Sequence, residues 1–197
     1  MDEGNHGLGG GVSAPDERDL LLRHRAGEAG AFAGLVAGYR RPVYSYLARC
    51  GVAEADRDDL FQEIFVKIHA AAGRYEGGRA LHPWLFTIVA NTVRTYHRKR
   101  KVREMVFADP PAREPRAADA GGERQAMAAQ TAAWLEQEIG KLPLAQREVL
   151  ILTAVENLPH KDVAEILGLP VNTVKTHLRR ARLTLVQRLA RRNEVPS

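Results

Sequence analysis

The segment PHKDVAEILGLPVNTVKTHLRRAR, residues 159 to 182, constrains the fold of this chain most strongly, because it predicts two helices separated by a short turn. Gly168 should end the first helix, since glycine reaches a positive φ without strain. Pro170 suits the start of the second helix, where its missing N–H is not needed. Apolar residues then recur at three- and four-residue steps, which predicts one inward-facing stripe. The stripe consists of Val171, Val174, Leu178, Ala181 and Leu185.

The other face of the second predicted helix is polar and cationic. It carries Asn172, Lys175, Thr176, Arg179 and Arg180. No Asp or Glu occurs between Glu165 and Glu194, so the positive charge is not offset along the helix. This pattern is typical of a helix-turn-helix whose second helix lies in the major groove of DNA. The sequence therefore predicts a DNA-binding motif near its C-terminal end.

The charge of the whole chain also favours a polyanionic partner. The 197 residues carry a formal net charge of +5, and the sequence pI is near 9.6. The distribution is uneven, because residues 54–63 are acidic whereas residues 94–103 and 175–192 contain no carboxylate. One surface is thus suited to a basic partner, and two surfaces are suited to phosphate.

The sequence predicts a cytoplasmic protein without membrane insertion. Cys50 is the only cysteine, which excludes an intramolecular disulfide and a cysteine-rich metal site and favours a reducing compartment. The first residues lack the basic start and apolar core of a signal peptide. No apolar run approaches the roughly 18–20 residues that are needed to span a bilayer.

No enzyme activity, cofactor or metal site is predicted either. The seven histidines show no HExxH or other paired-ligand spacing. A nucleophile elbow, a P-loop and a glycine-rich dinucleotide fingerprint are absent from the sequence. A histidine-dependent nuclease is a distant alternative, which metal-dependent cleavage of DNA by the purified chain would reveal.

We predict an all-α chain with two small helical domains joined by a flexible linker. Apolar residues recur at helical spacing in residues 16–105 and 124–192, and no segment alternates as a strand does. Residues 1–15 are rich in glycine and are predicted to be a disordered tail. Residues 106–123 are rich in proline, alanine and glycine without an apolar period, and they are predicted to be the linker.

An acidic helix over residues 56–72 carries the first set of candidate residues in the N-terminal domain. In its sequence DDLFQEIF, Asp59, Gln62 and Glu63 fall at three- and four-residue spacing and therefore share one exposed face. Taken alone, this face is either an ordinary solvated surface, which is the commoner case, or a docking surface for basic side chains of a protein partner.

A long helix, expected to start at Pro83 and to end in HRKRK, carries the second set of candidate residues. Pro42 is likewise expected to start a helix. Asn91 could contact a base edge, while Arg94 and Arg98 could hold phosphates. The aromatic residues Trp84, Phe86 and Tyr96 could stack on unpaired bases. Burial in the core is the favoured role for Trp84, and Tyr75 in the preceding loop is better placed to meet an extruded base.

The order of these pieces resembles the extracytoplasmic-function (ECF) sigma factors of the sigma-70 family. The pieces are an acidic DLxQE helix, a WL…N helix with a basic end, a linker, an LP…REV…L segment and the helix-turn-helix. The resemblance implies that the acidic helix binds the clamp helices of the β′ subunit of core RNA polymerase through Asp59, Gln62 and Glu63. It also implies that an anti-sigma factor controls the chain.

The resemblance further implies two contacts with promoter DNA. Tyr75 and Asn91 match the pocket for a flipped base near the minus-ten element, with Arg94 and Arg98 beside the backbone. The helix-turn-helix matches the part of the family that reads the minus-thirty-five element and rests on the β flap. Asn172 departs from the glycine of many relatives and could add a DNA contact.

The main alternative is a stand-alone helix-turn-helix regulator that binds a palindromic operator as a dimer. Such a regulator has no need of the DLxQE helix or of the WL…N helix. No heptad seam for dimerisation is evident in the sequence.

Overall fold

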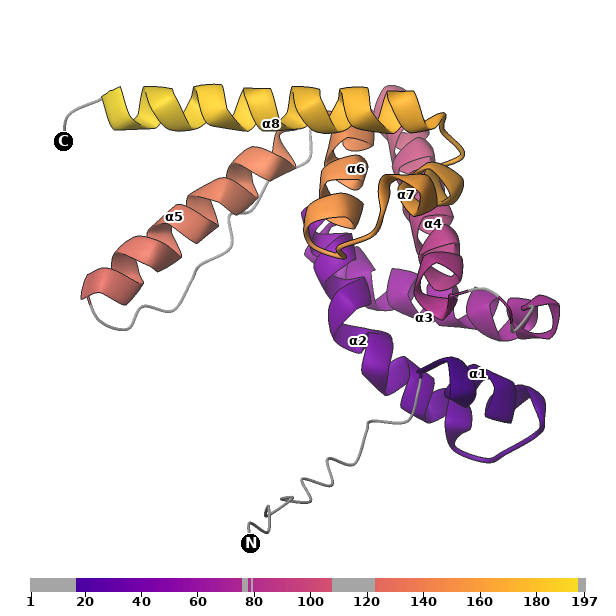
Figure 1. Ribbon diagram of the computed structural model, residues 1–197. Helices are drawn as coiled ribbons and strands as arrows, with labels where there is room; N and C mark the ends of the chain where they lie inside the picture. Colours follow the sequence, from indigo (N-terminus) through magenta and orange to yellow (C-terminus); the bar gives the residue numbers. More distant parts are fainter. Residues whose placement is uncertain (1–16, 76–77, 79, 108–122, 195–197) are drawn as a thin grey trace, which may run out of the picture.

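The computed structural model describes residues 17–75, 78, 80–107 and 123–194. Over these ranges the chain forms α-helices, one 3-10 turn and no strand, which confirms the all-α prediction. The N-terminal lobe contains α1 (Glu17–Arg25), α2 (Ala31–Arg49), α3 (Glu54–Ala71), η1 (Ala72–Arg74) and α4 (Leu81–Phe107). The C-terminal lobe contains α5 (Glu123–Gly140), α6 (Leu144–Ala154), α7 (His160–Leu167) and α8 (Val171–Glu194) (Figure 1).

The core of the N-terminal lobe is built from the apolar stripes of α2, α3 and α4. These stripes follow the three- and four-residue spacing of amphipathic helices. Their fully buried members include Leu35, Val43, Leu47, Ile64, Ile68, Leu85, Val89 and Val93. Each buried side chain of this size contributes about 1.5–3 kcal/mol relative to an exposed one. The α2–α3–α4 packing therefore holds the exposed faces of α3 and α4 in fixed relative positions.

Pro42 lies inside α2 and does not start a helix, so that prediction was wrong. A proline within a helix removes one backbone hydrogen bond and crowds the carbonyl four residues earlier, at a cost of about 3 kcal/mol. The crowded residue here is Gly38, which has no side chain and is exposed, so water can reach its carbonyl. Tyr39 and Val43 are buried on either side of the interruption, and their burial keeps the helix continuous.

Each of the helices α6, α7 and α8 begins directly after a Leu-Pro pair. Pro143 and Pro159 have φ values of −53° and −57°, which the pyrrolidine ring imposes. The carbonyl of Pro170 accepts hydrogen bonds from the N–H groups of Thr173 and Val174, at 2.9 and 3.1 Å, and so opens α8. The leucine before each proline is buried or half-buried. The repeated pair therefore anchors the start of each helix in the core.

The helix-turn-helix forms as predicted between α7 and α8. Gly168 ends α7 with φ 62°, and the N–H of Leu169 donates to the carbonyl of Ala164 at 2.9 Å. Val174, Leu178 and Ala181 are buried and Leu185 is half-buried, as the spacing predicted. Val171 was wrongly placed in this stripe, because its side chain is 37% exposed. Helical side chains tilt toward the N-terminus of their helix. The side chain of Val171, the first residue of α8, therefore extends past the surface of α8 that packs against α7.

The two lobes pack directly against each other. Helix α7 lies along α4 and α6 lies against α2, while α8 runs across the top of the molecule (Figure 1). One buried apolar cluster extends through both lobes. The predicted tail and residues 108–122 of the predicted linker lie outside the described residues, and residues 106, 107 and 123 belong to helices. The exact domain boundaries stay predictions.

Candidate nucleic-acid and protein interfaces

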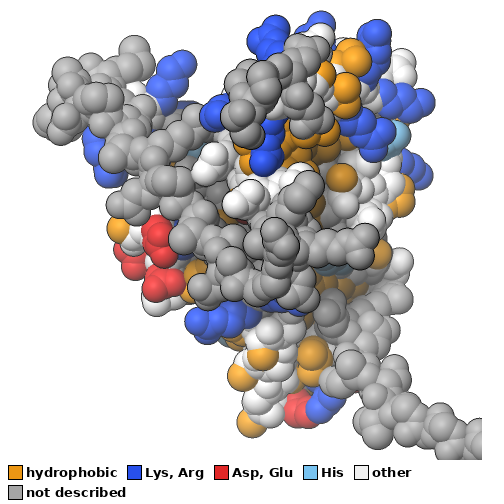
Figure 2. All heavy atoms as spheres, turned by 90° about the vertical axis from the view of Figure 1, so that its left-hand side faces the viewer, with side chains coloured by type: hydrophobic (Ala, Val, Ile, Leu, Met, Phe, Trp, Pro, Cys, Tyr) orange, Lys and Arg blue, Asp and Glu red, His pale blue; other side chains and the backbone are white. Residues whose placement is uncertain are grey.

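The cationic face of α8 is exposed along its whole predicted length. Asn172, Lys175, Thr176, Arg179 and Arg180 are all exposed to solvent. The hydroxyl of Thr176 donates to the carbonyl of Asn172 at 2.8 Å, so this side chain is turned toward its own helix. Lys and Arg side chains gather along the upper edge of the molecule, where α8 lies (Figure 2). The geometry suits a polyanion that runs along α8.

The second half of α8 presents an apolar surface beside these cations. Leu183, Val186 and Leu189 are exposed, and Val186 reaches 63%. Exposed apolar side chains also lie among the Lys and Arg side chains at the top of Figure 2. Exposed apolar patches with a charged rim often mark protein contacts. Sequence reasoning missed this surface, although its spacing of three residues is visible in the chain.

The acidic face of α3 is only partly free. Asp59 and Gln62 are exposed, whereas Glu63 is ion-paired with Lys67 at 2.6 Å. The ammonium group of Lys67 also donates to the hydroxyl of Thr92 on α4, at 3.1 Å. Val66 lies one turn beyond Gln62 and is 68% exposed, which adds an apolar contact to the face. Sequence reasoning did not single out Val66.

The three candidate residues of α4 have different surroundings. Asn91 and Arg98 are exposed. Arg94 lies between them on the same face, and its guanidinium Nε is 3.0 Å from both carboxylate oxygens of Glu148 on α6. Arg94 Nη1 donates to the carbonyl of Leu167 at 2.8 Å. The C-terminal lobe therefore covers the middle of the α4 face that the sequence assigns to DNA.

Tyr75 is buried, with 1% of its surface exposed. Its ring centroid lies 5.1 Å from that of Trp84, with an interplanar angle of 57°, and its carbonyl accepts a hydrogen bond from Arg25 at 2.8 Å. Phe86 is fully buried, and the hydroxyl of Tyr96 donates to Asp56 at 2.7 Å. In this arrangement Tyr75 and Phe86 are buried in protein, whereas Trp84 and Tyr96 are half-buried.

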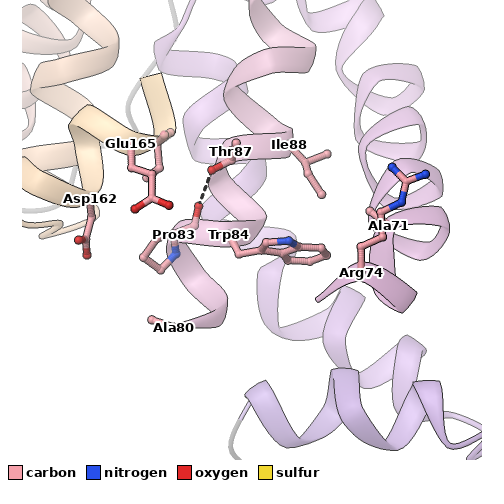
Figure 3. A pocket seen from close by; sticks show the side chains of 10 residues that line it. Ala71, Arg74, Ala80, Pro83, Trp84, Thr87, Ile88, Asp162 and Glu165 are labelled. Atoms are coloured by element: carbon pink, nitrogen blue, oxygen red, sulfur yellow. Dashed lines mark hydrogen bonds between the residues drawn. The ribbon is translucent and has the colours of Figure 1, made fainter. Parts of the chain in front are cut away.

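A pocket of about 450 Å³ opens between the two lobes beside Trp84, which is half-buried. In Figure 3, Trp84 of α4 lies between Arg74 of η1 on one side and the carboxylates of Asp162 and Glu165 of α7 on the other. The hydroxyl of Thr87 donates to the carbonyl of Pro83 at 3.0 Å in its wall. The pocket is thus an aromatic surface between charges of opposite sign.

The polar contact between the lobes, here called the seam, consists of Tyr46, Arg94, Arg147, Glu148 and the carbonyls of Cys50 and Leu167. The Tyr46 hydroxyl lies 3.4 Å from Glu148 Oε1, and Arg147 Nη1 donates to the Cys50 carbonyl at 2.9 Å. Burial raises the pKa of the Glu148 carboxyl, and Arg94 opposes that rise. The only sequence signal for Glu148 was a charged Arg-Glu pair inside an otherwise uncharged helix.

No group of three or more His, Cys, Asp or Glu side chains in the described part of the chain is placed to hold a metal ion. His24 Nε2 and His69 Nδ1 lie 3.0 Å apart, although the sequence spacing did not pair them. Within the same described residues, no helix combines the length and apolar character that a bilayer span requires.

Comparisons with known proteins match both lobes to known families. The family model described as sigma-70 region 2 matches residues 35–103, and the model described as sigma-70, region 4 matches residues 132–185. The RNA polymerase sigma factor NccH of Alcaligenes xylosoxydans xylosoxydans is 32% identical over 177 residues, which cover 88% of this chain and 95% of the relative. The ECF RNA polymerase sigma-E factor of Escherichia coli (strain K12) is 30% identical over 184 residues, with coverage of 88% and 95%.

Solved structures share the fold. The structure of CnrH in complex with the cytosolic domain of CnrY gives a TM-score of 0.64 at 28% identity, with coverage of 89% of this chain and 97% of CnrH. The sigma factor RpoE in complex with the anti-sigma factor NepR from Bartonella quintana gives 0.69 at 22% identity, with coverage of 82% and 98%. The second likeness concerns the fold alone.

Proposed function

The chain belongs to the extracytoplasmic-function sigma factors of RNA polymerase, and from this premise we propose how its surfaces share promoter recognition. A sigma factor binds core polymerase and directs it to particular promoters; members of this family are not enzymes. In our proposal, α3 binds the clamp helices of the β′ subunit, α4 and the loop before it act at the minus-ten element, and α8 reads the minus-thirty-five element. The chain then acts in the cytoplasm, where polymerase transcribes.

The observation that carries this proposal is the presence of two exposed surfaces of opposite charge on one chain. The acidic face of α3 exposes Asp59 and Gln62, and the face of α8 exposes Lys175, Arg179 and Arg180. Phosphates attract the α8 face and repel the α3 face. A protein that only binds DNA has no use for the α3 face, whereas a subunit that links polymerase to DNA needs both.

The proposed action at the minus-ten element involves Asn91, Arg98, Arg94 and Tyr75. Flipping a base from the stack costs a few kcal/mol, and stacking with edge contacts returns roughly 1–3 kcal/mol per base. Asn91 and Arg98 are exposed and ready for such contacts. Tyr75 must first leave its contact with Trp84, and Arg94 must leave Glu148.

Two further protein partners follow from the family. We propose that the apolar stripe of Leu183, Val186 and Leu189 on α8 contacts the flap of the polymerase β subunit. An anti-sigma protein is proposed as the inhibitor that holds the chain inactive. Co-purification of the chain from its native host tests the second proposal, and recovery of the chain without any inhibitor would remove it.

The double substitution Asp59→Ala with Gln62→Ala tests the role of α3. We expect loss of core polymerase in a pull-down, because both side chains are exposed on the face that should meet basic residues of the clamp. Binding of the variant to duplex minus-thirty-five DNA should be unchanged. Glu54→Ala removes an exposed carboxylate from the start of the same helix and serves as the matched control. Unchanged core binding by the double variant would refute the assignment of α3.

A gel shift separates the proposal from a stand-alone regulator. A sigma factor of this kind should shift duplex promoter DNA specifically only when core polymerase is present. A regulator would shift the same DNA alone and would require a palindrome. The base sequence that α8 reads is not transferable from relatives, since one altered side chain changes discrimination by about 1–3 kcal/mol per base pair.

A further inference from the structure

Two ion pairs and one histidine–carboxylate contact between described residues join the lobes, and all three have the same orientation. Arg49 pairs with Glu136 at 2.9 Å, His82 lies 3.4 Å from Glu156, and Arg94 pairs with Glu148 at 3.0 Å. The cationic or protonatable partner belongs to the N-terminal lobe in each case, and the carboxylate belongs to the C-terminal lobe. At these three contacts the C-terminal lobe presents a carboxylate to the N-terminal lobe, as a nucleic acid would present a phosphate.

The Arg94–Glu148 pair is the most enclosed of the three. The Glu148 side chain is 1% exposed and that of Arg94 is 30% exposed. Arginine binds carboxylate and phosphate with the same N–H groups. Because Glu148 and the Leu167 carbonyl take up Arg94 Nε and Nη1, those donors are not available to a phosphate in this arrangement. The packed α7 also lies along the helix that carries Asn91 and Arg98.

The N-terminal lobe is shaped to receive the C-terminal lobe at this point. Gly51 has φ 79°, and a Cβ atom there would lie 2.7 Å from Arg147 Nη1. A side chain at residue 51 would crowd the Arg147 guanidinium, which here donates to the Cys50 carbonyl. The same carbonyl also lies 2.9 Å from His97 Nε2. The seam is a fitted contact rather than an accidental meeting of two surfaces.

We propose that Glu148 is an intramolecular substitute for a promoter phosphate, which closes the two lobes over α4 until polymerase and DNA separate them. The proposal rests on the proposed function through the DNA contact of Arg94. In the closed form the chain holds Arg94 on its own carboxylate. In the open form Arg94 is released to the minus-ten strand and Glu148 returns to water.

The physical chemistry of the pair suits a contact that opens. A buried ion pair recovers in attraction much of what it loses in desolvation, so it specifies an arrangement more than it stabilises one. Opening hydrates both Arg94 and Glu148, so neither charge is left buried without a partner. The same opening exposes the apolar contact between α4 and α7, which opposes it and keeps the free chain closed.

The lone cysteine provides a probe of this opening in the full-length native chain. Cys50 is the only cysteine, its side chain is 0% exposed, and its carbonyl belongs to the seam. Burial, with Glu148 nearby, raises the pKa of its thiol, so the closed form should react slowly with a thiol reagent such as DTNB. The Glu148→Gln variant should react about tenfold faster or more, a typical size for one coupling interaction. Glu136→Gln, which alters an outer pair, is the matched control and should react nearly as the parent does.

The dependence of the labelling rate on urea separates opening of the seam from global unfolding. Separation of two folded lobes exposes less surface than global unfolding does, so its rate should depend less steeply on urea. A rate that equals the global unfolding rate and shares its urea dependence would overturn the proposal. So would equal labelling of the parent and the Glu148→Gln variant. If that variant does not fold, the exchange Arg94→Glu with Glu148→Arg should restore slow labelling. Fast labelling of the exchanged pair would count against closure by the Arg94–Glu148 pair.

Binding of a single-stranded minus-ten oligonucleotide tests the phosphate-substitute role itself. Glu148→Gln should bind the oligonucleotide more tightly than the parent, and a second substitution, Arg94→Gln, should remove the gain. Faster Cys50 labelling without that gain would overturn the substitute role. The pull-down with the α3 variants is independent of the labelling and oligonucleotide results. Failure of the proposed Glu148 closure and failure of the sigma-factor proposal are therefore distinguishable.

Discussion

Single polar side chains determine which residues of α4 are free to contact DNA. Asn91, Arg94 and Arg98 share one face, yet only Arg94 is tied to the other lobe, by bonds of 2.8 to 3.0 Å. Lys67 reaches α4 from α3 in a similar way, through the Thr92 hydroxyl at 3.1 Å. Asn91 and Arg98 are therefore accessible to DNA in the closed molecule. Arg94 becomes accessible only when the lobes separate.

Substitution of Asn91 and of Arg98 should affect different steps of initiation. Asn91→Ala should reduce promoter melting more than initial binding, because an amide contacts a base edge only after the base has left the stack. Permanganate footprinting of complexes with polymerase measures the melting. Arg98→Ala should instead weaken binding across sequences and lower the slope of log affinity against log salt by about 1, as loss of one phosphate contact does. Equal melting by the Asn91→Ala variant and the parent would exclude the base contact.

At the scale of elements, charged contacts hold α5 on α8. Arg188 Nη1 lies 3.0 Å from the Glu138 carbonyl and 3.0 Å from Glu138 Oε2, and Lys141 bonds the same carboxylate. The Arg192 guanidinium lies 5.1 Å from the centroid of the Trp134 ring. The position of α5 should therefore depend on the ionisation of Glu138.

Acidification should release α5 before the rest of the fold. The hydrogen bond from Lys141, with help from Arg188, lowers the pKa of Glu138 below its ordinary value of 4.5. A carboxyl whose folded pKa is lowered contributes stability that is present above its unfolded pKa and lost as pH falls through the folded value. Glu138→Gln should cost about 1–2 kcal/mol near neutral pH and should abolish this part of the acid sensitivity. Trp134 fluorescence over a pH series measures it, and an unchanged acid transition in the variant would contradict the assignment.

At the scale of the whole molecule, the two lobes share one apolar cluster and one polar seam. Domains that share so much buried surface lose each other's support when either unfolds. The sigma-factor lobes of the free chain should then behave as one cooperative unit, although the chain joins them through a predicted linker.

The two tryptophans allow a direct measurement of that cooperativity. Trp84 lies in the N-terminal lobe and Trp134 in the C-terminal lobe, so Trp134→Phe and Trp84→Phe each leave a probe of one lobe. Urea unfolding followed through either probe should give the same midpoint and slope. Addition of Glu148→Gln should separate the two midpoints. Distinct midpoints before that substitution would show that the lobes are independent.

The sequence by itself determined the local structure. Periodic apolar residues in amphipathic helices, the glycine that ends α7 and the Leu-Pro pairs that open α6 to α8 act over a few residues, so their effects are readable along the chain. It also placed the exposed cations of α8 and the acids of α3, because a helix face follows from spacing alone. It failed at Pro42, where burial of neighbouring side chains overrides the proline, and at Val171, where the end of a helical contact decides exposure.

Only the tertiary structure decided how the lobes meet. Arg94, Cys50 and Tyr46 have their partners between 54 and 102 positions away along the chain. These partners are Glu148, Leu167 and Arg147. No periodic pattern connects such residues, since their meeting depends on the summed packing of α2, α4, α6 and α7. Packing within the N-terminal lobe placed Tyr75 against Trp84, and Val66 of α3 stays exposed. Burial of apolar surface between the lobes acts over the whole molecule. It determines which of the charged residues predicted from the sequence are free and which are already paired.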